Sequence, residues 1–219
     1  MPTILIVCGE RGVGKTTALA AAAQRLAAAG TNVGGVLCPG RYENGVKSVI
    51  LWTDAAGGPQ RSLARLATSI SGQSGRPVLD ASDHKLLRYG KWEFNREELR
   101  LADHVATDAI RLLAPPSGQV HTNTDPVTPR AVFIDEIGPL ELDYGVGFTC
   151  TLAALDALAS SFATLRDDKR SPAAIVAVRP ELVPSLLARW PEALVLRIRI
   201  EDREETAGKI SRLFENVDR

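Results

Sequence analysis

The sequence has few residues from which a disulfide framework or a zinc site could be built. It has three cysteines and three histidines in 219 residues, and they are widely separated. No C-x-x-C pair is present, and no histidine stands at ligand spacing from a cysteine. We therefore expect buried or half-buried thiols and no zinc centre. The residues concerned are Cys8, Cys38, Cys150, His84, His104 and His121.

The sequence also lacks an excess of charge and any long hydrophobic run. Lys plus Arg equals Asp plus Glu at 26 each, and no block of five or six like charges occurs. This pattern argues against an extended surface for nucleic acid or membrane. No apolar run approaches the roughly 18 residues of a membrane-spanning helix, and no cationic leader precedes the first apolar segment. We expect a soluble, cytoplasmic protein. The balanced charge does not exclude small charged substrates.

Apolar strand patterns alternate with helical patterns along almost the whole chain. This alternation predicts an α/β fold with a mostly parallel central sheet between helices, formed by residues 1–219 as one domain. Residues 114–130 contain four prolines and few apolar side chains, so we expect a flexible loop there. The predicted strands are 4–8, 32–38, 46–52, 130–135, 173–178 and 193–200, and the predicted helices are 16–29, 61–70, 95–113, 148–165, 181–190 and one after Asp202.

Smaller signals mark turns and helix starts. Asn44-Gly45 favours a tight turn between two early strands. Asn95, with Glu98 three residues later, is typical of a helix N-cap, and Asp202 with Glu205 repeats the pattern. The segment from the predicted helix at 61–70 to Phe94 is expected to be irregular.

Directly after the first strand, residues 9–16 read G-E-R-G-V-G-K-T, which satisfies the phosphate-binding pattern G-x-x-x-x-G-K-[ST]. In such a loop consecutive backbone N–H groups surround the phosphates, the lysine reaches the β and γ oxygens, and the hydroxyl is a ligand for Mg²⁺. A helix follows, so the anion also meets a helix N-terminus. The predicted binding residues are Gly9, Glu10, Arg11, Gly12, Val13, Gly14, Lys15, Thr16 and Thr17.

A second motif, Asp135-Glu136, ends the apolar strand at 130–135. We expect Asp135 to serve Mg²⁺ together with Thr16, and Glu136 to activate the attacking water, with Lys15 as the other catalytic group. Residues 135–138 also form a D-x-x-G pattern, in which Gly138 would sense the γ-phosphate. No [NT]-K-x-D motif for reading guanine is present, so we expect loose base selectivity.

The chain resembles the small P-loop nucleoside-triphosphatases called the cancer-related or thermophile NTPase family. The resemblance implies Mg²⁺-dependent hydrolysis of ATP, GTP and other nucleoside triphosphates on an α/β fold. It is carried by five segments, which are the phosphate loop ending G-V-G-K-T-T, Val33-Gly34-Gly35 with the following turn, Arg88-Tyr89-Gly90, residues 134–142 (I-D-E-I-G-P-L-E-L) and Glu201-Asp202-Arg203.

Three features depart from that family. Pro139 replaces the family's lysine, Glu10-Arg11 replaces small and proline residues, and 114–129 resembles an insertion. A lost lysine near the γ-phosphate could be replaced by an arginine. The candidates are Arg11, Arg179, which follows a strand where related NTPases keep a phosphate sensor, and Arg203.

Two other functions stay open. The first is a P-loop small-molecule kinase, although the only candidate lid, residues 71–77, carries Arg76 as its one charge. The second is a nucleotide-dependent accessory module with slow hydrolysis, whose protein partner the sequence does not name. Arg88 and Tyr89 are candidates for contact with the base or ribose, but packing of Tyr89 near Trp92 is favoured.

Overall fold

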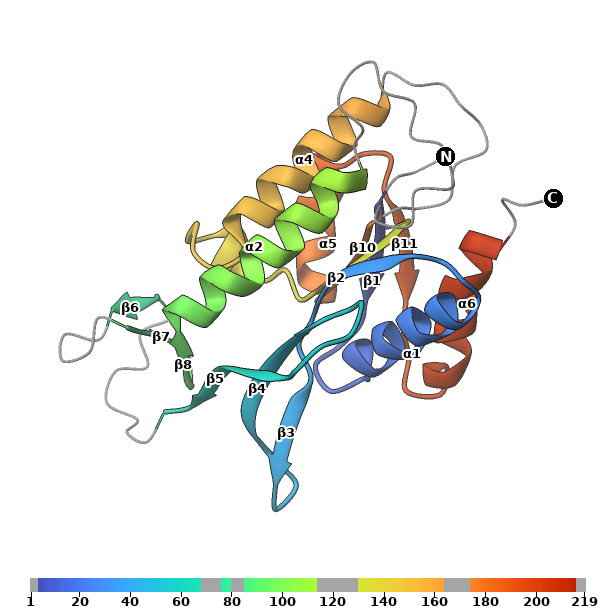
Figure 1. The fold of residues 1–219 in the computed structure, drawn as a ribbon. Coiled ribbons are helices and arrows are strands. Elements are labelled where there is room, and N and C mark those ends of the chain that lie inside the picture. Colours follow the sequence, from blue (N-terminus) through green and yellow to red (C-terminus); the bar gives the residue numbers. More distant parts are fainter. Residues whose placement is uncertain (1–3, 68–75, 80–84, 114–129, 164–173, 216–219) are drawn as a thin grey trace.

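The computed structural model describes residues 4–67, 76–79, 85–113, 130–163 and 174–215. These residues form an α/β fold in which one mixed sheet lies between helices (Figure 1). The strands are β1 (Ile4–Cys8), β2 (Val33–Leu37), β3 (Gly40–Glu43), β4 (Val46–Asp54), β5 (Arg61–Leu66), β6 (Val78–Leu79), β7 (Leu86–Tyr89), β8 (Trp92–Asn95), β9 (Ala131–Asp135), β10 (Ala174–Val178) and β11 (Leu194–Arg197).

The sheet has a parallel part and an antiparallel part. Its order is β11-β1-β10-β9-β2-β4-β5-β8-β7-β6, with β3 paired to β4. The first five strands are mutually parallel, and every later pairing in this order is antiparallel. Because β10 lies between β1 and β9, the carboxyl ends of these three strands lie next to one another at one edge. Ligands of parallel α/β sheets bind at that edge.

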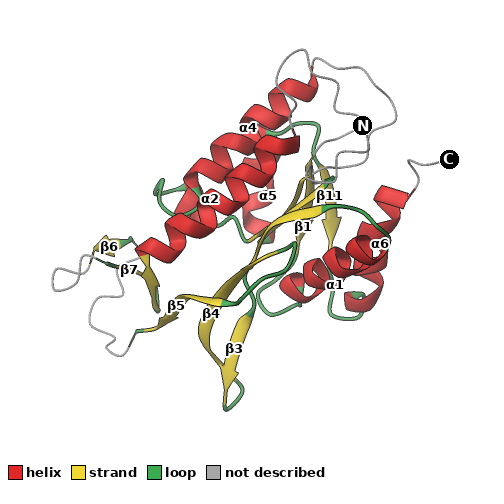
Figure 2. Cartoon of the chain, in the orientation of Figure 1, coloured by secondary structure: helices red, strands yellow, loops and turns green. Residues whose placement is uncertain are grey.

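Helices cover both faces of the parallel part (Figure 2). Alternate residues of β1 therefore pack into different cores, with Ile4 and Ile6 on the side of α2, α4 and α5, and Leu5 and Val7 on the side of α1 and α6. A strand buried on both faces is continuously apolar, as β1, β9 and β10 are. The helices are α1 (Lys15–Ala28), α2 (Arg96–Leu113), α3 (Pro139–Leu142), α4 (Thr149–Ala163), α5 (Val183–Arg189) and α6 (Arg203–Glu215).

Three of the sequence predictions were wrong. Cys150, which was expected to be buried or half-buried, is exposed at the start of α4, and the other two lie in the antiparallel part. Residues 61–66 of the predicted helix 61–70 form strand β5, which pairs with β4 and β8. Leu63 and Ala64 are buried while Arg61 and Arg65 are exposed, and pairing on both edges outweighs the moderate helix propensity of this short segment. The segment expected to be irregular contains the β7–β8 hairpin. Residues 68–70 of the helix prediction lie outside the described residues.

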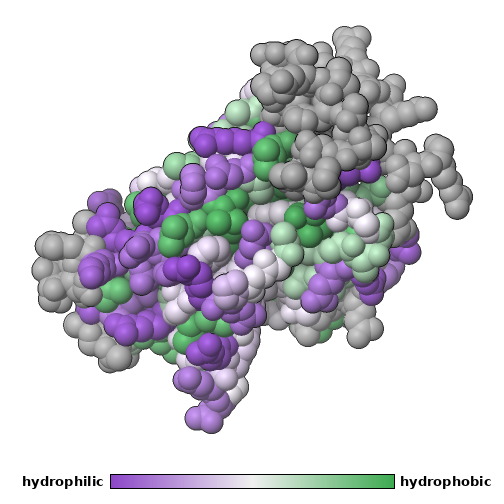
Figure 3. All heavy atoms as spheres, in the orientation of Figure 1, coloured by the Kyte–Doolittle hydropathy of each residue, from purple (hydrophilic) through white to green (hydrophobic). Residues whose placement is uncertain are grey.

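The early hairpin is confirmed, with different bounds. Asn44 and Gly45 have φ of 50° and 77°, which is the conformation of a tight two-residue hairpin turn. The expected loop before it is strand β3, so the hairpin is β3–β4, and it projects from the end of the fold at which β1 enters the phosphate loop (Figure 1). Its tip is hydrophilic (Figure 3). The predicted flexible loop falls at 114–129, outside the described residues.

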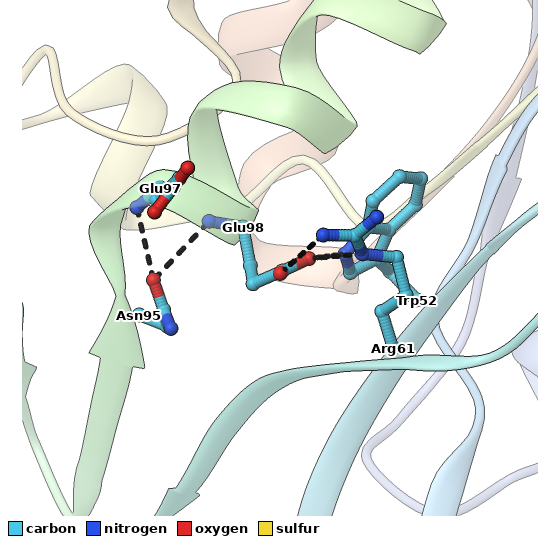
Figure 4. Close-up of polar contacts among 5 residues, drawn as sticks. All are labelled: Trp52, Arg61, Asn95, Glu97 and Glu98. Atoms are coloured by element: carbon cyan, nitrogen blue, oxygen red, sulfur yellow. Dashed lines mark hydrogen bonds and ion pairs between the residues drawn. The ribbon is translucent and has the colours of Figure 1, made fainter.

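The start of α2 confirms the predicted cap and shows a second role for its glutamate (Figure 4). Asn95 Oδ1 accepts hydrogen bonds from the N–H groups of Glu97, at 3.0 Å, and Glu98, at 3.2 Å. The Glu98 carboxylate instead accepts the indole N–H of Trp52 at 2.8 Å and a pair of bonds from Arg61, both at 2.7 Å. Glu98 thus ties the start of α2 to β4 and β5. None of the described helices is long and apolar enough to cross a membrane.

Candidate active site

The loop between β1 and α1 is shaped to receive phosphate. Gly12 and Gly14 have φ of 80° and 104°, a region that side chains rarely adopt. No side chain caps the N-terminus of α1, and its first turn has no acidic residue. Its N–H groups therefore face outward as an anion site. The Lys15 ammonium crosses the loop and donates to the carbonyl oxygens of Gly9 at 2.6 Å and Glu10 at 3.2 Å.

Asp135 links this loop to two further strands. Its carboxylate, only 2% exposed, accepts a hydrogen bond from the Thr16 side chain and another from the Cys38 N–H at 3.0 Å. Burial raises the pKa of Asp135 to about 6, and the bonds from Cys38 and Thr16 oppose that rise. The ends of β9 and β2 and the start of α1 therefore meet at this carboxylate.

Glu136 is held by an arginine from the next strand. The Arg179 Nε–H donates to Glu136 Oε1 at 3.2 Å, and Arg179 Nη1 lies 3.9 Å from Glu181 Oε1. Both side chains in the closer pair are about one-third exposed, at 36% and 33%, so the pair borders solvent. Of the three candidate arginines, the structure brings Arg179 to the carboxylates. Arg11 is exposed on the loop, and the side chain of Arg203 lies outside what the structure describes.

The turn after β9 depends on a buried carboxylate to which the sequence analysis gave no role. Glu141 Oε2 accepts the Gly138 N–H at 2.9 Å, and Oε1 accepts the Phe148 N–H at 3.1 Å. Burial raises the pKa of Glu141 to about 7 against the effect of these backbone bonds. The sequence did offer a signal for this role, because Glu141 stands between two leucines, Leu140 and Leu142, in the segment 134–142. Gly138 thus lies beside the site, fixed by Glu141.

Arg88 and Tyr89 are engaged in packing contacts. Arg88 forms an ion pair with buried Glu93 at 2.9 Å. The Tyr89 ring meets Tyr144 edge to face at 5.7 Å. Packing thus accounts for Tyr89, which lies opposite Trp92 in the β7–β8 register, as expected, and whose ring also contacts Tyr144. These contacts support no role in binding the base.

Several of the predicted site residues therefore lie together at the carboxyl edge of the parallel strands, while Glu10, Arg11 and Thr17 are exposed on the rim of the loop. The phosphate loop supplies Lys15 and Thr16, β9 supplies Asp135 and Glu136, and β10 is followed by Arg179. This set combines a phosphate cradle, hard oxygen donors for a cation, a solvent-facing carboxylate and an arginine.

Comparison with known proteins shows that the chain is similar to nucleoside-triphosphatases. Residues 4–111 match the model of the family described as NTPase. Over 210 residues the chain is 26% identical to the nucleoside-triphosphatase THEP1 of Methanopyrus kandleri, covering 96% of this chain and 94% of that protein. The fold is also that of a human cancer-related nucleoside triphosphatase, with a TM-score of 0.62, 18% identity and 98% of each chain covered.

The family match includes the phosphate loop, the hairpin and most of α2. The relative and the shared fold extend the likeness to the segment that carries Asp135, Glu136 and Arg179. The chain is therefore similar to nucleoside-triphosphatases over almost its whole length.

Proposed function

We propose that this chain is a Mg²⁺-dependent nucleoside-triphosphatase that hydrolyses ATP, GTP and other nucleoside triphosphates to the diphosphate and phosphate. The observation that carries the proposal is the junction of loop and carboxylates. Thr16 bonds Asp135, and Arg179 bonds the adjacent Glu136. A phosphate chain in the loop would therefore end against both carboxylates.

The loop would bind the β and γ phosphates. Its backbone N–H groups and the N-terminus of α1 offer dipoles to the phosphates. Lys15 is already inside the loop, bonded to the carbonyl oxygens of Gly9 and Glu10. A phosphate oxygen is a stronger acceptor than a carbonyl, so Lys15 can exchange one of these bonds for a phosphate contact.

Thr16 and Asp135 fit Mg²⁺. Both present oxygen atoms, which this ion prefers, and Mg²⁺ takes its other ligands from substrate phosphates and water. No cluster of three or more His, Cys, Asp or Glu that could hold a metal occurs among the described residues, as expected for an ion bound largely by its substrate. Such an ion, when bound, neutralises charge on the β and γ oxygens.

Glu136 is placed to activate water. It follows the proposed metal ligand directly, and its side chain is one-third exposed, so water can reach it. Its bond to Arg179 fixes the carboxylate, and the same arginine can turn toward charge that develops on the transferred group. Water as the acceptor favours hydrolysis over the kinase alternative. The absence of a guanine-reading motif supports broad base selectivity.

Phosphate release tests the proposal directly. The chain is assayed with ATP, GTP, CTP and UTP, with Mg²⁺ and with a chelator, and no other acceptor. We expect release from several nucleotides, dependent on Mg²⁺. Lys15→Ala should lose triphosphate binding, while Glu136→Gln should bind normally and lose most hydrolysis. If Glu136→Gln hydrolyses ATP at the wild-type rate, the assignment of Glu136 is wrong.

The same assay separates the two alternatives. A kinase would release little phosphate until an acceptor is added. An accessory module would turn over very slowly until its protein partner is present. Steady release by the isolated chain, without either addition, would exclude both.

A further inference from the structure

Lys47, a lysine of the β3–β4 hairpin that belongs to neither the phosphate loop nor the Asp135-Glu136 motif, extends toward the candidate active site. Lys47 lies on β4, opposite Tyr42 of β3 in the strand register. Its side chain runs over Gly40. A Cβ atom placed on Gly40 would lie 2.2 Å from Lys47 Cε and 3.0 Å from Nζ. Since Gly40 begins β3, the Lys47 ammonium lies near the end of the hairpin that joins the sheet.

That end of the hairpin adjoins the proposed metal site. Gly40 is two residues after Cys38, whose N–H donates to Asp135 at 3.0 Å. The charge of Lys47 acts electrostatically on the side chains of both Asp135 and Cys38, as expected for an ammonium on this side of the carboxylate. The hairpin leaves the sheet at the end where β1 enters the phosphate loop (Figure 1).

The other cations of the site are already engaged. Lys15 is bonded to loop carbonyls, and Arg179 is bonded to Glu136. Within the described ranges, the Lys47 side chain has no hydrogen bond or ion pair. A lysine side chain that lies over a glycine, near the proposed metal site and without an ion-pair partner among these residues, suits an anion that arrives with a ligand.

We propose that Lys47 is a further substrate-binding residue, which contacts the terminal phosphate of a bound nucleoside triphosphate from the side opposite Lys15, and that Gly40 creates the space for it. This inference rests on the proposed function. Because the contact is to the third phosphate, Lys47 distinguishes a triphosphate from a diphosphate. The contact also lowers the barrier to hydrolysis if it strengthens as charge moves during phosphoryl transfer.

Four variants test it. Lys47→Met removes the charge at similar length, and Lys47→Arg keeps the charge. Gly40→Ala pushes the side chain aside, and Arg41→Gln, the matched control, removes an exposed cation from the same hairpin. Affinities are measured for a non-hydrolysable triphosphate analogue and for the diphosphate, with hydrolysis alongside. Thermal unfolding checks that each variant is folded.

For Lys47→Met we expect triphosphate affinity and kcat/KM to fall by about 10- to 100-fold, the effect of one charge-assisted hydrogen bond, with diphosphate affinity unchanged. Lys47→Arg should recover most of the loss, and Arg41→Gln should lose nothing. Gly40→Ala should show a smaller loss that disappears in the Lys47→Met background.

Equal loss of diphosphate and triphosphate affinity in Lys47→Met, or no loss of either, would overturn the proposal. The two proposals fail separately. If the wild-type chain hydrolyses nucleotides and Lys47→Met matches it in rate and in triphosphate affinity, only the role of Lys47 is wrong. If the wild-type chain hydrolyses none, the proposed function is wrong, and the ratio of triphosphate to diphosphate affinity still decides the role of Lys47.

Discussion

Replacing Glu141 with glutamine should change how the stability of the fold depends on pH. In the wild type, both carboxylate oxygens accept backbone N–H groups, from Gly138 at 2.9 Å and from Phe148 at 3.1 Å. Glutamine keeps one acceptor and turns an NH₂ group toward the other N–H. A buried donor without an acceptor costs about 1–3 kcal/mol. The variant also cannot ionise, which is the property that the pH series measures.

The direction of the pH dependence of stability follows from the pKa of Glu141, which burial raises from 4.5 to about 7. The folded state then binds the proton more tightly than the unfolded state. The resulting stabilisation is fully present below pH 4.5 and is lost as pH rises through 7. Between pH 5 and pH 8 this group should lower the free energy of unfolding of the wild type by about 2–3 kcal/mol. Glu141→Gln lacks this loss, so it should be the less stable protein at pH 5, with a deficit that shrinks by that amount by pH 8.

Urea unfolding of both proteins at pH 5, 6, 7 and 8 measures the difference. The titration of Asp135, whose pKa burial also raises, is present in both proteins and cancels in the comparison. The control is Glu192→Gln, which makes the same chemical change at an exposed glutamate before β11. A difference between Glu141→Gln and wild type that stays constant, or grows with pH, would refute the reasoning.

Three further substitutions have defined outcomes. Arg179→Ala removes the donor to Glu136 and should lower kcat by about 10³-fold or more with folding unchanged, and a wild-type kcat in steady-state assays would contradict this. Asp103→Asn puts an amide where a buried carboxylate accepts the N–H groups that begin α4, so urea unfolding should show a loss of about 1–3 kcal/mol, and an unchanged midpoint would count against that contact. Glu98→Ala leaves the buried indole N–H of Trp52 without its acceptor and should lower Tm, whereas Gln at 98 should lower it less.

The parallel part of the sheet was predictable because the burial of each strand is visible in the hydrophobicity of its own residues. A strand buried on both faces, such as β1 or β10, has to be a continuous apolar run, and the phosphate loop requires a strand before it and a helix after it. The Asp135-Glu136 pair was predictable for the same reason, since it ends such a run. The contact between Thr16 and Asp135 then follows from which strand ends are adjacent.

The antiparallel part was less predictable because pairing partners decide its structure. Residues 61–66 have no strong strand pattern, and β5 forms because β4 and β8 offer edges on both sides. Asp103 could have been found, since it lies four residues after Leu99 and seven before Ile110, on the apolar face of α2. A buried carboxylate at that spacing requires donors, and the start of α4 provides them.

Lys47 could not have been found from the sequence, since a lysine in a polar hairpin looks like any solvated charge. What distinguishes it is the absence of a side chain at Gly40 on the paired strand, and that pairing is a property of the fold. The shift in register between Arg41 and Tyr42 sets which residue lies opposite Lys47. A change in hairpin register by one residue would turn Lys47 to the other face and away from Asp135. The Asn44-Gly45 turn fixes that register, so a turn remote from the phosphate loop helps to determine which charges face it.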